Sequence, residues 1–265
     1  MGDKLKLKAV VSDESSDEEA KEDENELDLP LDKLNLGPRK KLLVLCLGDL
    51  LVRRVHLRDK HTVRGFKPDV IHGKFLVFKR PFCTDFMKFC FDRFVVGLWS
   101  AAREHNIDAV LRCITGYENR NNLAFVWSQE ECRESGYYCL EKKEKPLFLK
   151  NLADLWEKKY GYHFDLPWKK GEYSASNTLL IDTEPHVSLL NPNNTAIFPK
   201  PFKTPDPEDT FLGSNGELRK FLEGVTDAED VPTYVKKHRI GQPPITPSHP
   251  DWSFYQKIVH RFRKK

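Results

Sequence analysis

The chain has 265 residues, a formal net charge of +3 and 39% hydrophobic residues, which predicts one sizeable globular domain with tails. No stretch approaches the roughly 20 apolar residues of a membrane span, and no signal or transit peptide is recognisable. We therefore expect no membrane span and six reduced cysteines.

Charge is spread unevenly along the chain. Residues 1–30 carry 11 acidic and 4 basic side chains, so the remaining residues carry a net charge of +10. An acidic tail on a basic body suits an anionic partner, with the tail either solubilising the protein or competing for that partner. We expect a disordered acidic tail at 1–37, a folded domain at 38–245 and a basic C-terminal tail at 246–265.

Strand-like and helix-like segments alternate through the folded part. The expected strands lie at 42–47, 94–99, 123–127, 177–183 and 194–199. The expected helices lie at 84–94, 100–111, 150–161, 216–225 and 231–238. Thr84 and Ser100 are expected N-caps, Gly161 is expected to close its helix, and residues 52–78 indicate short strands and turns. This alternation predicts a three-layer α/β domain with right-handed crossovers.

Polar residues follow several of these expected strands. They are the Cys46–Asp49 loop, Ser100, Lys150 at the start of a helix, and Asp182. Ligands of such sheets bind at the carboxyl ends of the strands, so these residues are expected to meet. A hydroxyl, a lysine and an acid together suit a phosphate group, although Ser100 alone could be only a cap and Lys150 only a solvated helix residue.

The chain resembles a known family in several extended stretches between residues 40 and 245. These include FLVFKRPFCTDFMKFCFDRFVVGLWSAA, KPLFLKNLADLW and NTLLIDTEPHVSLLNPNNTAIFP. They are similar to the phosphatase branch of the haloacid dehalogenase (HAD) superfamily that includes RNA polymerase II carboxy-terminal-domain phosphatases and NLI-interacting-factor-like proteins. The resemblance implies that residues 38–245 form an FCP1-homology domain. Its fold would be a HAD-type Rossmann-like three-layer sandwich, with a mostly parallel sheet of about five strands and a small flap after the first strand.

The same resemblance implies roles for individual residues. Family enzymes carry an aspartate nucleophile and, two residues later, an aspartate general acid/base after the first strand, and they use Mg²⁺. At matching positions this chain has Cys46 and Gly48. Ser100 and Lys150 match the family's phosphate-binding residues. A late acidic pair that holds Mg²⁺ in the family is reduced here to Asp182, with Thr183 at its second position.

Two residues offer partial substitutes for the lost carboxylates. Cys46 could attack phosphorus as a thiolate, but cysteine phosphatases place an arginine after five intervening residues, and Arg53 comes one place too late. A cysteine that ends a buried strand is more often an inert small hydrophobe. Asp49 is a displaced acid that could bind metal weakly with Asp182, but it does not fall on either catalytic position.

The leading hypothesis is a catalytically degenerate phosphatase-fold protein that binds phosphoproteins or acts as a regulatory scaffold. One alternative is an active Mg²⁺-dependent serine/threonine phosphatase, acting on phosphorylated peptides such as the RNA polymerase II C-terminal domain. A further alternative is a protein similar to the mitochondrial inner-membrane translocase receptor. No cofactor is expected unless activity is retained, in which case it is Mg²⁺.

The expected partner is a phosphorylated protein or peptide, in the nucleus or cytoplasm rather than in mitochondria. The basic stretch KIVHRFRKK at 257–265 could contact nucleic-acid phosphates or direct nuclear import, and a solvated tail is the more common explanation. Nucleic acid is therefore not expected as a direct ligand.

Overall fold

The structure is a computed structural model that describes residues 39–116, 120–141, 143–158 and 166–263. The chain divides into two units, 1–39 and 40–265, and all elements described below belong to the second. The tail expected to be disordered, at 1–37, and Gly161, expected to close a helix, lie outside the described residues. No helix in the described part of the chain is both long and apolar enough to cross a membrane.

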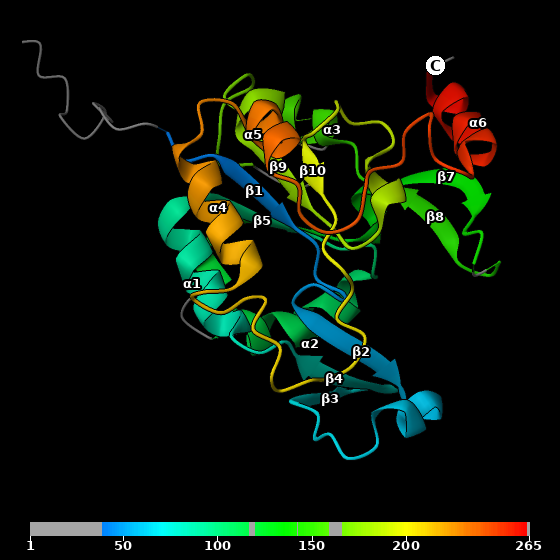
Figure 1. Ribbon diagram of the computed structural model, residues 1–265. Helices are drawn as coiled ribbons and strands as arrows, with labels where there is room; N and C mark the ends of the chain where they lie inside the picture. The colour runs from blue at the N-terminus through cyan, green and yellow to red at the C-terminus, as the bar shows by residue number, and fades with distance from the viewer. Residues whose placement is uncertain (1–38, 117–119, 142, 159–165, 264–265) are drawn as a thin grey trace, which may run out of the picture. The chain divides into compact units, whose positions relative to one another are not determined.

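A five-stranded parallel sheet forms the centre of the fold, in the order β10-β9-β1-β5-β6 (Figure 1). Its strands are β1 Leu42–Leu45, β5 Val95–Trp99, β6 Leu123–Trp127, β9 Thr178–Ile181 and β10 Ala196–Ile197. All four residues of β1 and of β9 are buried, because both faces of the sheet are covered. The expected mostly parallel sheet of about five strands is confirmed.

Alternate residues of β1 pack into two different hydrophobic cores. Leu43 and Leu45 join one core with α1 Cys83–Arg93, α2 Glu104–Thr115, α4 Glu217–Asp227 and α5 Val231–Lys237. Leu42 and Val44 join the other with the short α3 Leu152–Trp156 and the segment 166–173. Successive strand residues point to opposite faces, so this division produces the three layers expected from the sequence.

Two smaller sheets extend the central one. The first is an antiparallel flap directly after β1, in the order β2-β4-β3, made of β2 Val52–His56, β3 Val70–His72 and β4 Phe75–Lys79. It confirms the expected small flap. The second pairs β7 Arg133–Tyr138 with β8 Pro146–Leu149, which the sequence analysis did not anticipate.

The basic C-terminal segment contains a helix, α6 Trp252–Arg263, beside the β7–β8 hairpin (Figure 1). Ile258 is fully buried and packs with Leu147 and Leu149 of β8. The sequence predicts only a basic tail for this segment, because the basic residues on its exposed side mask a short apolar face.

Three expected helix boundaries are wrong. The N-cap of α1 is Phe82 rather than Thr84, whose hydroxyl instead accepts a hydrogen bond from Lys79 Nζ at 3.2 Å. The next helix begins at Glu104, because the backbone N–H of Ser100 donates to the Trp127 carbonyl at 2.8 Å and prolongs the strand pairing. Lys150 follows the end of β8 directly and lies before Asn151, the N-cap of α3, so it does not open the helix.

We predict that Gly97→Ala lowers the free energy of unfolding by about 1–3 kcal/mol, because a Cβ there would lie 2.0 Å from Phe125 Cε1. Chemical denaturation of both proteins measures the change. Gly48→Ala is the matched control, since no atom lies within 4 Å of its added Cβ, and its effect should stay within about 0.5 kcal/mol. Equal losses for both variants would contradict the packing argument.

Candidate functional site

A cavity of about 650 Å³, here called the strand-end pocket, lies at the carboxyl ends of β1, β5 and β9. The structure brings all the predicted site residues into its lining, namely Cys46, Gly48, Asp49, Ser100, Lys150, Asp182 and Thr183. Parallel strands present their carboxyl ends at one edge of the sheet, which explains why residues far apart in the sequence meet there.

Cys46 stands directly after β1 and is almost completely buried. Its backbone N–H donates to the Ile181 carbonyl at 2.9 Å, which continues the β1–β9 pairing by one residue. Its thiol lies 3.6 Å from the Gly48 carbonyl, to which it donates. The side chain is therefore held inside the first-strand loop and is only 3% exposed.

Burial raises the pKa of the Cys46 thiol well above its ordinary value of 9.0, and the negative charge of Asp182 raises it further. Lys150 lowers that pKa but does not outweigh burial. The structure places Lys150 near Cys46, a basic neighbour that the sequence does not indicate. Cys46 nevertheless stays a neutral thiol near pH 7, and a thiol is a poor nucleophile.

Asp49 points its carboxylate toward the flap. Its backbone is left-handed, with φ 57°, and its N–H donates to the Val52 carbonyl at 2.7 Å in a tight loop. Arg53 Nη1 donates to both carboxylate oxygens, at 3.0 and 3.2 Å. Gly48, which the resemblance matches to an acid/base position, contributes no side chain, so the loop offers no free carboxylate.

Lys150 and Asp182 form a buried ion pair on the floor of the strand-end pocket. Lys150 Nζ donates to Asp182 Oδ2 at 2.6 Å and also to the Trp99 carbonyl. The two residues are 1% and 4% exposed, so Lys150 is not a solvated helix residue. Asp182 Oδ1 accepts a further hydrogen bond from the Glu184 backbone N–H at 3.0 Å.

The Lys150 ammonium keeps its proton in spite of its surroundings. Burial alone would lower its pKa, but the Asp182 carboxylate opposes burial and leaves the pKa of Lys150 above its ordinary value of 10.5. Lys150 is therefore a permanent cation, and the negative charge of the Asp182 carboxylate balances it. His186, nearby, has its pKa lowered by burial and is neutral near pH 7.

The two hydroxyl residues of the site are both buried. Ser100 Oγ accepts a hydrogen bond from the Ala102 backbone N–H at 3.1 Å, which leaves its own O–H proton available to a ligand. Thr183 is 6% exposed, and its carbonyl accepts from Gln242 Nε2 at 3.0 Å.

Further charged residues of the strand-end pocket escaped the sequence analysis. Lys145 pairs with Glu184 at 3.1 Å, and Arg53 with Asp49. Arg54 and Arg103 line the same pocket without an acidic partner in the described residues. The two consecutive arginines after the first-strand loop could have indicated a basic site in the sequence. Only the folding of the flap, however, places Arg54 against the pocket.

Arg54 is held in place by its neighbours. Its Nη2 donates to Asn106 Oδ1 at 3.1 Å, and its guanidinium lies 4.4 Å from the centre of the Phe75 ring. Burial lowers the pKa of Arg54, but an arginine keeps its charge in proteins. Asn106 donates its backbone N–H to the Arg103 carbonyl at 3.0 Å, which links the two arginines.

These side chains do not fit the Mg²⁺ that the family relationship implies. Mg²⁺ binds through carboxylates, yet Asp182 is already neutralised by Lys150 and Asp49 is bound by Arg53. Cys46 is a neutral thiol, and Gly48 has no side chain. Across the described ranges, no three His, Cys, Asp or Glu side chains converge as a metal site.

Comparisons with known proteins agree on one family. The family model of NLI interacting factor-like phosphatases matches residues 41–232. An FCP1 homology domain-containing protein of Schizosaccharomyces pombe (strain 972 / ATCC 24843) is 28% identical over 156 residues, which are 58% of this chain and 59% of that protein. This chain therefore spans well under two thirds of that relative.

Two solved structures are also similar. That of Fcp1, an essential RNA polymerase II CTD phosphatase, has 12% identity and a TM-score of 0.40, covering 83% of this chain and 62% of that one. A fission yeast Fcp1 variant bound to beryllium fluoride has 14% identity and a TM-score of 0.39, covering 85% and 64%.

We predict that Lys150→Met lowers the free energy of unfolding by about 3–5 kcal/mol, because it leaves the Asp182 charge buried without a partner. Chemical denaturation near pH 7 measures the loss. Lys145→Met is the matched control, since its pair with Glu184 is 45% and 47% exposed, and it should cost no more than about 1 kcal/mol. A loss at Lys150 as small as the control's would contradict the pairing.

The Lys150–Asp182 pair makes the free energy of unfolding decrease as the pH rises into the alkaline range. The pKa of Lys150 is higher in the folded than in the unfolded chain, so its contribution is complete below pH 10.5 and is lost as pH rises through the folded value. Denaturation curves at increasing pH should show a steeper decline in the wild type than in Lys150→Met.

We predict that iodoacetamide near pH 8 leaves Cys46 unmodified in the folded protein and labels it after denaturation, because the thiol is buried and protonated. Mass spectrometry of the peptide LLVLCLGDLLVR, residues 42–53, measures the labelling. Cys113, which is partly exposed, is the internal control and should label faster in the folded chain. Faster labelling of Cys46 than of Cys113 would show a reactive thiolate.

Proposed function

The chain belongs to the NLI interacting factor-like phosphatase family, and on that basis we propose that it is a catalytically degenerate member that binds phosphorylated protein segments. The strand-end pocket binds the phosphate group without hydrolysing it. One observation carries the proposal: Cys46, which the resemblance matches to the family's nucleophile position, is a buried thiol whose pKa is raised.

Loss of hydrolysis follows from the groups that the pocket lacks. Transfer of a phosphoryl group to an enzyme needs an activated nucleophile and cations that neutralise the developing charge. Cys46 is neutral, Gly48 can neither donate nor accept a proton, and Asp182 is bound to Lys150. Catalytic groups that act as a unit leave little activity once several of them are gone.

Binding of phosphate follows from the charge that remains. The lining of the strand-end pocket contains five lysine and arginine side chains and three acidic ones, and the three acids are all paired. The excess of positive charge comes from Arg54 and Arg103, which have no acidic partner among the described residues. A phosphoserine carries about −1.5 to −2 at neutral pH, so two unpaired arginines balance it. The Ser100 hydroxyl can donate a further hydrogen bond, and Lys150 supports the site by keeping Asp182 neutralised.

An active Mg²⁺-dependent phosphatase is the second candidate, because Asp49 and Asp182 line the same cavity. That function would require Asp49 to leave Arg53 and Asp182 to leave Lys150. Each release would unpair a cation, and in the Lys150 case the cation is fully buried. We propose the binding function for this reason, with a nuclear or cytoplasmic phosphoprotein as partner.

We predict that a fluorescent phosphoserine peptide binds the full chain saturably, that its unphosphorylated form binds at least about tenfold more weakly, and that the wild type shows no Mg²⁺-dependent hydrolysis of it. Arg54→Gln should weaken binding of the phosphopeptide by about tenfold or more, because it removes an unpaired cation from the pocket. Fluorescence anisotropy measures the affinity, and phosphate release measures hydrolysis.

Arg58→Gln is the matched control, since Arg58 is exposed on the flap outside the pocket lining and should alter affinity by no more than about twofold. Thermal unfolding of each variant verifies that it is folded. Turnover by the wild type that a chelator abolishes would establish the active phosphatase instead. Equal affinity for the phosphorylated and unphosphorylated peptides would contradict the proposed phosphate-binding function.

A further inference from the structure

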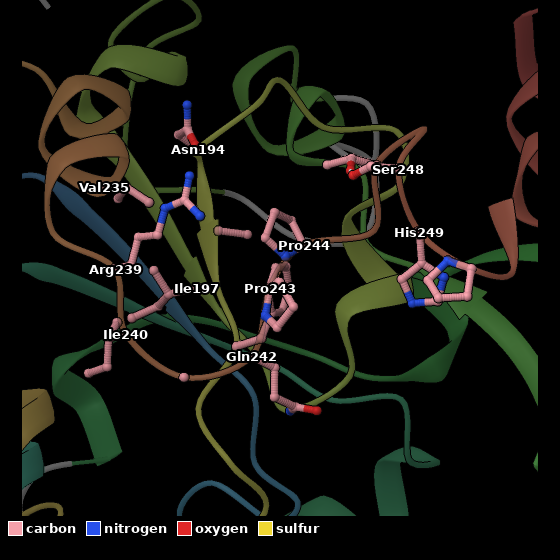
Figure 2. A pocket seen from close by; sticks show the side chains of 15 residues that line it. Asn194, Ile197, Val235, Arg239, Ile240, Gln242, Pro243, Pro244, Ser248 and His249 are labelled. Carbon is pink, nitrogen blue, oxygen red and sulfur yellow. The ribbon is translucent and has the colours of Figure 1, made fainter.

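A second cavity of about 560 Å³, here called the edge pocket, lies at the β10 edge of the central sheet (Figure 2). Its walls come from β10, from the end of α5 and from the segment that follows α5. Cavities of this size hold ligands of a few hundred cubic ångströms. Neither the family's catalytic positions nor the residues of the strand-end pocket contribute to it.

The lining of the edge pocket is mostly apolar and carries one full positive charge. Ile197, Val235, Ile240 and Pro243 provide apolar surface, and no acidic residue lines the cavity. Arg239 is exposed at its border, and in the described structure no acid pairs with its guanidinium. The pocket therefore suits a group that is apolar at one end and anionic at the other.

The exposed sheet edge adds backbone hydrogen-bonding groups. In the part of the chain that the structure describes, β10 pairs with a strand only on its β9 side. The Thr195 carbonyl accepts from Leu180 of β9 at 2.9 Å, and the Ile197 carbonyl accepts from Asp182, directly after β9, at 3.1 Å. Strand geometry therefore directs the N–H and C=O of the intervening Ala196 to the open side. Ala196 lines the edge pocket.

The wall of the edge pocket that faces β10 is formed around Gln242 and is held in place by hydrogen bonds. It leaves the backbone of Ala196 unpaired on that side within the described ranges. Gln242 donates its backbone N–H to the Phe198 carbonyl at 2.6 Å, and its side chain points away from the cavity to the carbonyls of Thr183 and Pro199 (Figure 2). The next two residues are prolines, which have no N–H to offer to Ala196. The pairing groups of Ala196 are thus open to an incoming chain.

We propose that the edge pocket binds an extended acidic segment of a partner protein. The segment's main chain pairs with Ala196, one aliphatic side chain enters the apolar cavity, and a neighbouring carboxylate contacts Arg239. Addition of an extended peptide to an exposed sheet edge supplies affinity through the main chain and specificity through a side-chain pocket. This site is separate from the proposed phosphate site and does not depend on it.

An experiment with defined peptides tests the proposal. Isotope-labelled full-length protein is titrated with an acetylated six-residue peptide of alternating aspartate and leucine, and amide NMR shifts report both the site and the affinity. We expect saturable shifts at Ala196 and around Arg239. Arg239→Glu should weaken binding about tenfold or more, because attraction becomes repulsion.

Lys237→Glu is the matched control: it changes the net charge equally at the last residue of α5, two residues before Arg239, but lies outside the lining, so affinity should change by no more than about twofold. Two altered peptides test the other contacts. Serine in place of leucine removes the apolar anchor, and N-methylation of alternate amides removes main-chain pairing; each should weaken binding at least about tenfold.

Several results would overturn the proposal. They are the absence of saturable shifts at Ala196, equal effects of Arg239→Glu and Lys237→Glu, or undiminished binding of the serine peptide. Shifts confined to the strand-end pocket would assign acidic peptides to the phosphate site instead. Because both variants change exposed residues, amide spectra of the free proteins verify that each is folded.

Discussion

The buried Lys150–Asp182 pair is the interaction on which the rest of the site depends. Lys150 Nζ reaches Asp182 at 2.6 Å and also binds the carbonyl that ends β5, so one ammonium joins three elements at the carboxyl edge of the sheet. A buried charge is tolerated only with a partner. Because Cys46 is neutral, Asp182 is the partner of the Lys150 ammonium. Its carboxylate is therefore not available to bind a metal ion.

A neutral thiol at Cys46, where a carboxylate would add a negative charge, therefore decides the charge balance of the pocket floor. A second carboxylate beside Lys150 would leave the floor negative and ready for a divalent cation, whereas the floor observed here is neutral. The remaining excess charge lies further out, on Arg54 of the flap and Arg103 before α2. A pocket with a neutral floor and two outer arginines is suited to hold an anion rather than to activate one.

The two cavities have no lining residue in common, but one hydrogen bond connects them, and they differ in chemistry. Gln242 lines the edge pocket, and its side chain donates to the carbonyl of Thr183, which lines the strand-end pocket. The strand-end pocket offers a hydroxyl and two arginines that have no acidic partner among the described residues. The edge pocket offers apolar surface, one arginine and a strand edge. A phosphorylated partner with an acidic, aliphatic stretch has chemistry that matches both.

The sequence by itself predicted the three layers and seven of the residues that line the strand-end pocket, because apolar periodicity and strand-end positions are local properties of the chain. The family was indicated by the resemblance of several extended stretches. It did not reveal β7, β8 or α6, whose apolar faces are short and interrupted by charge. Only the tertiary structure decided the pairing of Lys150 with Asp182, the burial that keeps Cys46 a thiol, and the placement of Arg54. Each of these depends on which distant segments meet, since a pKa and an ion pair are set by the neighbours that folding supplies.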